Sequence, residues 1–261
     1  MRSFSSFACF DWSGQAVARP KGIALATLAA DTDARPKLIA PPNGWSRDDA
    51  LRWILWHADA GTDMLIGLDL SPSFPFVDCG ACFPDWEDSP ADARALWQLV
   101  ETICAGDAHL SASSFVAHAD ARRYFRHACG NVGDRFGVAG VGRLREVERH
   151  QRLTRQANSA SCFNLVGAAQ VGKSSLTGMR VLNRLAGRIP LWPFEPVPHH
   201  GPVIVEIYTT MDARAAGLPG NRSKVRDRTT LVATLNQLGA RPPIRLARYD
   251  DHATDAILTT A

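Results

Sequence analysis

The order of the short apolar runs at the start of the chain is the feature that most limits its fold. Three such runs occupy 4–10, 21–30 and 36–40, and Pro, Asp and Gly separate them. Strands joined by short connections pair antiparallel, because parallel strands need a crossover of about a dozen residues or more. The start of the chain therefore predicts an antiparallel meander of three strands.

Helices and strands alternate after the meander. Apolar spacing and turn signals predict a buried strand over 63–70 and another over 203–208. Helices are expected at 46–61, 89–106, 112–129, 223–239 and from 250 onward. Because right-handed crossovers add later strands in parallel, the chain is predicted to be an α/β protein. Its mixed sheet, a three-strand meander plus parallel strands, is expected to be flanked by helices.

The chain is long enough to bury a full core as one domain, with 261 residues, of which 46% are hydrophobic and 21% charged. We predict a single domain over 1–261 with a long, basic and partly helical insertion at about 107–200. The opening "MRSFSSFACFDWSG" lacks the apolar stretch of a signal peptide, and no apolar run approaches the roughly 20 residues that span a bilayer. A cytoplasmic location without membrane contact is expected.

Acidic residues occur where this topology gathers side chains. Asp11 ends the first strand in "CFDWSG", and Asp69 ends the fourth in "IGLDLSPSFP". Glu206 lies in the fifth strand, "VIVEIY". Asp251 and Asp255 are four residues apart in "DDHATDAILTTA", which places them on one face of a helix. Since the first and fourth strands are expected to be neighbours in the sheet, these carboxylates are expected to meet.

Such a cluster predicts a divalent metal site. A buried aspartate is costly unless it is paired or bound to a metal, and clustered carboxylates raise one another's pKa. Mg²⁺ or Mn²⁺ removes that repulsion, and two ions about 3.5–4 Å apart can activate water against a phosphodiester. His252, three residues before Asp255, is a further candidate as a ligand or as the residue that orients the water. Taken singly, each aspartate is also typical of a turn or a helix cap.

Four segments give the chain a resemblance to a known family: "FDWSG", "GLDLSPSFP", "VEIY" and "DDHATDA". With them it resembles the predicted nucleases of the ribonuclease H superfamily that are catalogued as domain of unknown function 429. The resemblance implies a ribonuclease H-like fold and a metal-dependent nuclease core related to Holliday-junction resolvases. It implies metal ligation by Asp11, Asp69 and Asp255. It extends the metal ligation to Asp251 or His252 and to Glu206, and the catalytic role it implies for Asp251, His252 or Glu206 is to complete the metal shell or to orient water.

A second motif, "GAAQVGKS" at 167–174, matches the phosphate-loop pattern at every fixed position. An apolar run precedes it and a helical pattern follows. However, the residues after Ser174 offer only one convincing strand, which is too little for a parallel nucleotide-binding sheet. We interpret the motif as a Gly-rich turn whose Lys173 can reach a nucleic-acid phosphate.

Arginine is concentrated in 122–155, where nine arginines are opposed by three acidic residues. A cluster of this kind is the electrostatic footprint of contact with a phosphate backbone. The alternative is a solvated helix face with pairs such as Glu148–Arg152. The candidate nucleic-acid contacts are Arg143, Arg145, Arg149, Arg152, Arg155 and Lys173.

The sequence therefore favours a nuclease that uses Mg²⁺ or Mn²⁺ to hydrolyse phosphodiester bonds of nucleic acid. One alternative is a nucleotide-binding protein that uses the phosphate loop. Another nucleotide-binding alternative is an actin-like sugar kinase, because Asp11-Trp12-Ser13-Gly14 resembles the phosphate turn of those enzymes, although they need two copies of the fold. The third alternative is a catalytically silent nucleic-acid-binding module, which need not bind metal.

Overall fold

The structure, a computed structural model, describes residues 2–31, 33–138, 141–167, 170–218, 224–243, 245–246 and 249–261. The chain divides into two compact units. The sheet unit consists of Met1–Trp12, Arg19–Asp69 and Gly187–Ala261, and the helical unit consists of Ser13–Ala18 and Leu70–Ala186. The insertion predicted at about 107–200 overlaps the helical unit as far as Ala186.

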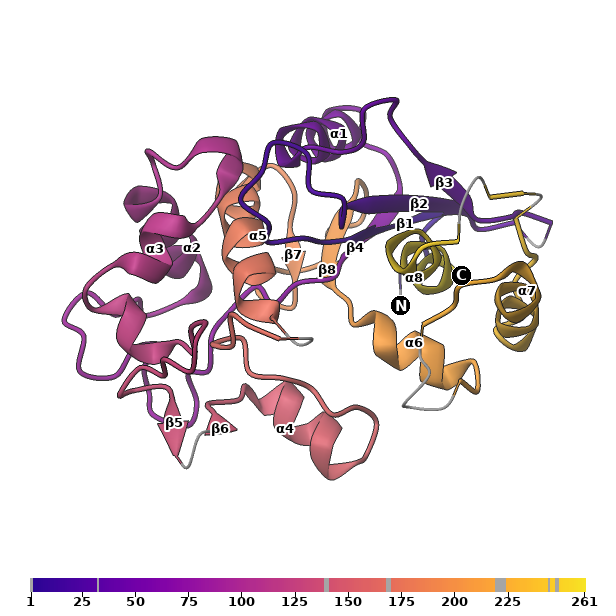
Figure 1. Cartoon of the computed structure of the whole chain (residues 1–261). Helices are drawn as coiled ribbons and strands as arrows, with labels where there is room; N and C mark the ends of the chain where they lie inside the picture. Colours follow the sequence, from indigo (N-terminus) through magenta and orange to yellow (C-terminus); the bar gives the residue numbers. More distant parts are fainter. Residues whose placement is uncertain are drawn as a thin grey trace. The chain divides into compact units, whose positions relative to one another are not determined.

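The sheet unit is built on a six-stranded mixed sheet in the order β3-β2-β1-β4-β8-β7 (Figure 1). Strands β1, β2 and β3 form the predicted antiparallel meander, whereas β4 pairs parallel with β1, and β8 pairs parallel with β4 and β7. The α/β prediction is confirmed. The strands are β1 (Ser6–Asp11), β2 (Ala24–Ala29), β3 (Lys37–Ile39), β4 (Met64–Leu68), β7 (Leu191–Trp192) and β8 (Val203–Glu206).

Helices cover both faces of this sheet, α1 on one and α8 on the other (Figure 1). Ser46 and Asp49 form a reciprocal capping box that starts α1, which satisfies two backbone donors. Asp227 and Asp250 cap α7 and α8 by accepting backbone hydrogen bonds. The helices of this unit are α1 (Arg47–Asp59), α6 (Thr209–Ala215), α7 (Arg228–Gln237) and α8 (Asp251–Thr260).

Side-chain alternation along β1 separates an apolar face from the face that carries the site. Phe10 is fully buried, and its ring lies 5.6 Å from that of Trp45 and 5.5 Å from that of Trp53 on α1. Cys9 and Asp11 therefore point to the opposite face, against which α8 packs. On that face, residues of β2, α7 and α8 form a continuous apolar core.

The helical unit is held by aromatic side chains. Its elements are α2 (Ala93–Ile103), η1 (Ala108–Leu110), α3 (Ser113–Ala117), η2 (Ala121–Tyr124), β5 (Gly137–Val138), β6 (Val141–Gly142), α4 (Glu146–Leu153) and α5 (Val171–Leu185). The rings of Phe74 and Phe163 stack with centroids 4.7 Å apart, and Phe83, Phe115 and Phe125 surround them.

Two helix predictions are corrected in this unit. The single helix expected at 112–129 is wrong: α3 ends at Ala117, and only the short η2 follows. Tyr124 and Phe125 are adjacent in the sequence, and both are buried. Adjacent residues of a helix point in different directions, whereas the extended backbone at Phe125 lets both side chains enter the core. The helix expected over 89–106 begins later, at Ala93, with Asp92 as its cap.

None of the helices in the described part of the chain has the length and apolar character needed to cross a bilayer.

Candidate carboxylate site

Strand pairing brings Asp11 and Asp69 together within the sheet unit. Phe10 and Leu68 are partners in the parallel β1–β4 pair, so the next residues, Asp11 and Asp69, lie side by side on the same face. The Asp69 amide donates to the Phe10 carbonyl oxygen at 3.0 Å, which continues the ladder to this point. Asp11 is buried, and Asp69 is partly exposed. The predicted meeting of these two carboxylates is therefore present.

Helix α8 adds Asp255 and His252 to this pair. His252 donates through Nδ1 to Oδ2 of Asp11 at 2.5 Å. Asp255 is buried one turn further along the helix, and Lys224 donates to its Oδ2. Three aspartates from β1, the end of β4 and α8 thus surround one position, with one imidazole and one ammonium as their cationic partners.

Asp251 lies at the rim of this group, although it shares the helix with Asp255. Its carboxylate accepts two hydrogen bonds from Arg226, at 2.8 and 3.0 Å. The Arg226 guanidinium lowers the pKa of Asp251 below its usual value. Asp251 is therefore an ordinary ionised surface partner, in contrast to the buried carboxylate one turn away.

The pKa values of Asp69 and Asp255 are raised. Burial raises the pKa of Asp69 well above its usual value, and the charges of Asp11 and Asp255 raise it further. A side-chain hydrogen bond between Asp69 and Asp11 favours the protonated form of Asp69. Burial likewise raises the pKa of Asp255 to about 6, although Lys224 opposes this. Perturbed carboxyl groups that cluster in this way are typical of functional sites.

The pKa values of the two cationic side chains, His252 and Lys224, are also raised, which favours their charged forms. The hydrogen bond to Asp11 raises the pKa of His252 and outweighs the effect of its partial burial. Burial alone would lower the pKa of Lys224, but Asp255, Asp11 and Asp251 together raise it. Both groups are therefore held in their charged forms by the carboxylates.

Three residues of the site neighbourhood were not predicted from the sequence. Lys224 is one, and the other two lie on α6. Thr209 donates to Oδ2 of Asp69 at 3.4 Å, and burial raises the pKa of Asp212. The sequence signal for the α6 pair is the i, i+3 spacing of Thr209 and Asp212 directly after "VIVEIY". Lys224 carries no local signal, because its partner lies 31 positions away.

Glu206 is not brought to this cluster. It is the register partner of Leu68 across the β4–β8 pair, and Leu68 is the partner of Phe10. Partners in parallel strands project to the same face, so Glu206 projects to the face of Phe10 and away from Asp69.

The carboxylates fit a hard divalent cation in chemistry, since Mg²⁺ and Mn²⁺ prefer oxygen ligands. The observed arrangement is not a preformed metal cage: within the described ranges, no group of three His, Cys, Asp or Glu side chains is placed to hold a metal ion. In this arrangement Lys224 pairs with Asp255, and His252 pairs with Asp11.

Two of the candidate nucleic-acid contacts in the helical unit serve its own structure. Arg143 donates to both carboxylate oxygens of Asp78, at 2.9 and 2.7 Å, and to three backbone carbonyl groups. Arg145 pairs with Glu148 and donates to Ser71. Both arginine side chains are only 10% exposed. These contacts hold the loop after Leu70 against α4, so few of these donors remain for a ligand.

The remaining arginines of this set are more exposed. Arg149 pairs with Glu146 at 2.9 Å, and Arg152 donates to the Ser159 carbonyl oxygen. Arg155 is exposed, in a backbone conformation with φ of 59°. A local ion pair of the kind expected in the alternative, a solvated helix face, is present at Glu146–Arg149, whereas Glu148 pairs with Arg145 in place of the suggested Arg152.

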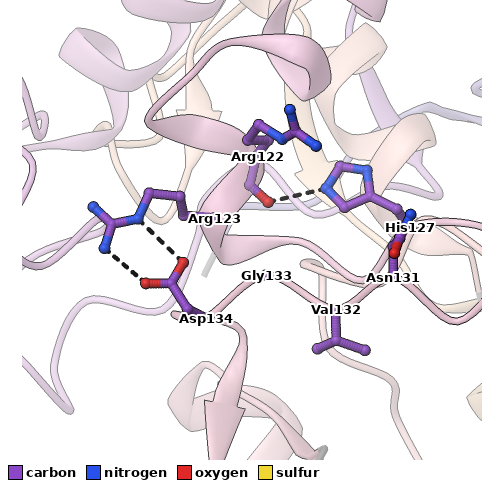
Figure 2. Close-up of a pocket in the computed structure, with 7 residues that line it drawn as sticks. All are labelled: Arg122, Arg123, His127, Asn131, Val132, Gly133 and Asp134. Atoms are coloured by element: carbon purple, nitrogen blue, oxygen red, sulfur yellow. Dashed lines mark hydrogen bonds and ion pairs between the residues drawn. The ribbon is translucent and has the colours of Figure 1, made fainter.

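A shallow basic pocket in the helical unit was not predicted (Figure 2). Its volume is about 270 Å³, and its lining includes Arg122, Arg123 and His127. His127 donates through Nε2 to the Arg122 carbonyl oxygen, and Arg123 makes a two-pronged ion pair with Asp134 (Figure 2). The Arg122 guanidinium, in contrast, makes no hydrogen bond or ion pair with any residue that the structure describes, and it is exposed.

The phosphate-loop motif lies at the start of α5, and its residues 168–169 are outside the described residues. Gly172, Lys173 and Ser174 belong to the first turn of the helix, and Lys173 is exposed. The described residues just before the motif form turns and one isolated bridge, whereas a nucleotide-binding loop follows a strand. A Cβ added to Gly14 would lie 2.3 Å from the Lys173 carbonyl carbon, so the Ser13–Gly14 segment covers this turn closely. The geometry gives nucleotide binding no support.

No protein-family model, curated protein or solved structure matches this chain.

Proposed function

We propose that the cluster of Asp11, Asp69 and Asp255 is the active centre of a hydrolase that cleaves phosphodiester bonds in nucleic acid. The observation that carries the proposal is the convergence of three carboxylates, from segments far apart in the sequence, on one position where burial raises the pKa values of Asp69 and Asp255. Such a cluster weakens the fold through burial and mutual repulsion, so a structural role explains it poorly. The antiparallel meander followed by parallel strands also supports the ribonuclease H-like fold that the resemblance implies.

Mg²⁺ or Mn²⁺ held by Asp11, Asp69 and Asp255 would supply Lewis-acid activation of water and of the phosphate. The chain's own residues have separable tasks. Asp11 fixes the imidazole of His252 through Nδ1, which leaves Nε2 of a half-exposed ring to exchange a proton. Because Asp11 favours the charged imidazole, His252 is suited to donate a proton to the leaving oxygen. Thr209 orients Asp69, and Arg226 keeps Asp251 ionised at the rim.

Cleavage of labelled nucleic acid is the direct test. We expect the purified chain to cut single-stranded DNA, duplex DNA or RNA when Mn²⁺ or Mg²⁺ is present, and to stop when EDTA is added. Product ends are read on a denaturing gel. Binding without cleavage of any of these substrates would contradict the hydrolase and leave the catalytically silent binding module.

Nucleic-acid affinity is expected to depend on Arg122. If its unpartnered guanidinium contacts a phosphate, Arg122→Gln should lower the slope of log affinity against log salt concentration by about 0.7–0.9. Arg123→Gln is the matched control, because the neighbouring guanidinium is engaged by Asp134. Filter binding or fluorescence anisotropy over a salt series gives both slopes. Equal slopes for Arg122→Gln and wild type would make the pocket a solvated surface.

A further inference from the structure

Lys224 reaches the site from a segment that precedes α7. Its side chain is 48% exposed, whereas the Asp255 carboxylate with which it pairs is only 7% exposed. The stem of Lys224 therefore comes in from solvent, and its ammonium ends at a buried oxygen. Asp11 and Asp251 also act on this ammonium electrostatically. All four residues belong to the sheet unit, so this arrangement does not depend on the placement of the other unit.

The Lys224 ammonium lies at Asp255, the carboxylate at which the proposed divalent cation would bind. Asp11 takes its compensation from His252, which donates to its Oδ2. Asp255 takes its compensation from Lys224. An ammonium and a divalent ion at the same partly buried carboxylate would repel each other strongly. Both cations cannot occupy Asp255 together without a large loss in affinity.

We propose that Lys224 is a built-in competitor of the divalent cation, a displaceable internal cation that must release Asp255 before the metal can bind. The inference rests on the proposed function, since it concerns the metal of that same site. The ammonium satisfies the buried carboxylate while the metal is absent. The long, half-exposed side chain can swing into solvent without disturbing α8 or the sheet. Lys224 thereby sets the metal concentration at which the site is loaded.

Metal binding to Lys224→Met tests this directly. Loss of the free Mn²⁺ signal in electron paramagnetic resonance gives the dissociation constant without reference to activity. We expect Lys224→Met to bind Mn²⁺ at least about tenfold more tightly than wild type, a modest part of the repulsion that is removed. Lys224→Arg keeps the positive charge, so it should bind no more tightly than wild type.

Arg226→Met is the matched control for the loss of one positive charge. Arg226 lies two positions away and pairs with Asp251, but its side chain is 71% exposed, so its field at Asp255 is screened by water. The Arg226→Met variant should leave the dissociation constant for Mn²⁺ nearly unchanged. Circular dichroism without metal checks that Lys224→Met is folded, and Lys224→Gln, which retains a hydrogen-bond donor, replaces it if it is not.

The outcomes separate the two proposals. Tighter binding by Lys224→Met than by wild type, or binding by Lys224→Met alone, supports the competition. Equal or weaker binding by Lys224→Met, with clear binding by wild type, overturns the competition and leaves the metal-dependent hydrolase intact. Absence of Mn²⁺ binding in wild type, Lys224→Met and Lys224→Gln alike overturns both. An equal gain in Arg226→Met would mean that net charge, and not the Asp255 contact, controls the affinity.

Discussion

Asp69→Asn is expected to remove nearly all metal-dependent cleavage while leaving the fold at least as stable as that of wild type. Asp69 is the informative position, because Asp11 and Asp255 would each lose a cationic partner on substitution, whereas Asp69 contacts Thr209 and shares a hydrogen bond with Asp11. An asparagine amide can donate to Asp11 as the protonated carboxyl does, and it adds no charge. The loss of a metal ligand should reduce the cleavage rate by about two to three orders of magnitude, on the scale of losing one preorganised electrostatic group.

The stability part of this expectation has a pH signature. A carboxyl group with a raised pKa holds its proton more tightly in the folded state, so the free energy of unfolding falls as pH rises from the unfolded to the folded pKa. For Asp255 this window runs from 3.8 to about 6, and Asp69 contributes a loss of the same sign. Asp69→Asn removes its own share of this loss. Its free energy of unfolding should therefore fall less across that window than that of wild type.

Asp63→Asn is the matched control at the other end of β4. Its carboxylate pairs with Arg2 and lies beyond the first residue of the strand, far from the Asp69 end. It should keep wild-type cleavage. Thermal melting with and without Mn²⁺ completes the measurement: wild type should melt higher with Mn²⁺, and Asp69→Asn should lose most of that rise. Wild-type cleavage by Asp69→Asn, or an unchanged Mn²⁺ rise, would contradict the carboxylate site.

Arg180→Met should destabilise the helical unit by about 3–5 kcal/mol, because it breaks a buried ion pair from one side. Arg180 on α5 is 1% exposed and donates to Glu101 of α2 at 2.6 Å. The same guanidinium donates to the carbonyl oxygens of Asp107 and Ser111, at 3.2 and 2.6 Å. The substitution therefore removes the cation that joins α2, α5 and the turn around η1, and it leaves two carbonyl groups without this donor.

Arg184→Met is the control for Arg180→Met, since Arg184 pairs with the same glutamate at 2.8 Å but is 39% exposed. An exposed pair of this kind contributes about 0–1 kcal/mol. Urea denaturation followed by tryptophan fluorescence gives both free energies of unfolding. Similar losses for the two variants would mean that burial does not set the strength of these pairs.

The sequence alone predicted the main strands and the meeting of two carboxylates, because these depend on local pattern. Short apolar runs separated by turn residues predicted the meander, and Asp11 and Asp69 each directly follow the apolar part of a strand. Strands that are adjacent and parallel must end at the same edge, so the proximity of these two residues followed from the element order.

The face of the sheet to which Glu206 projects could not be predicted from local sequence pattern. An acidic residue near the end of a strand was a reasonable site candidate, but its face depends on the register between β4 and β8. A shift of one residue in pairing moves every side chain to the opposite face, and the periodicity of a strand does not reveal that register. The pairing of Glu206 with Leu68 therefore had to come from the three-dimensional structure.

The sequence by itself thus predicted five strands of the main sheet, though not β7, and the meeting of Asp11 with Asp69 at the end of neighbouring strands. Only the tertiary structure decided their partners. Lys224 meets Asp255, His252 meets Asp11, and Arg143 meets Asp78 from 65 positions away. The physical reason is that a charge acts through distance in space, and the sequence spacing of long-range partners does not encode that distance. Only the contacts of the folded chain show which arginines remain available to a ligand. The same contacts show which cation lies at each carboxylate.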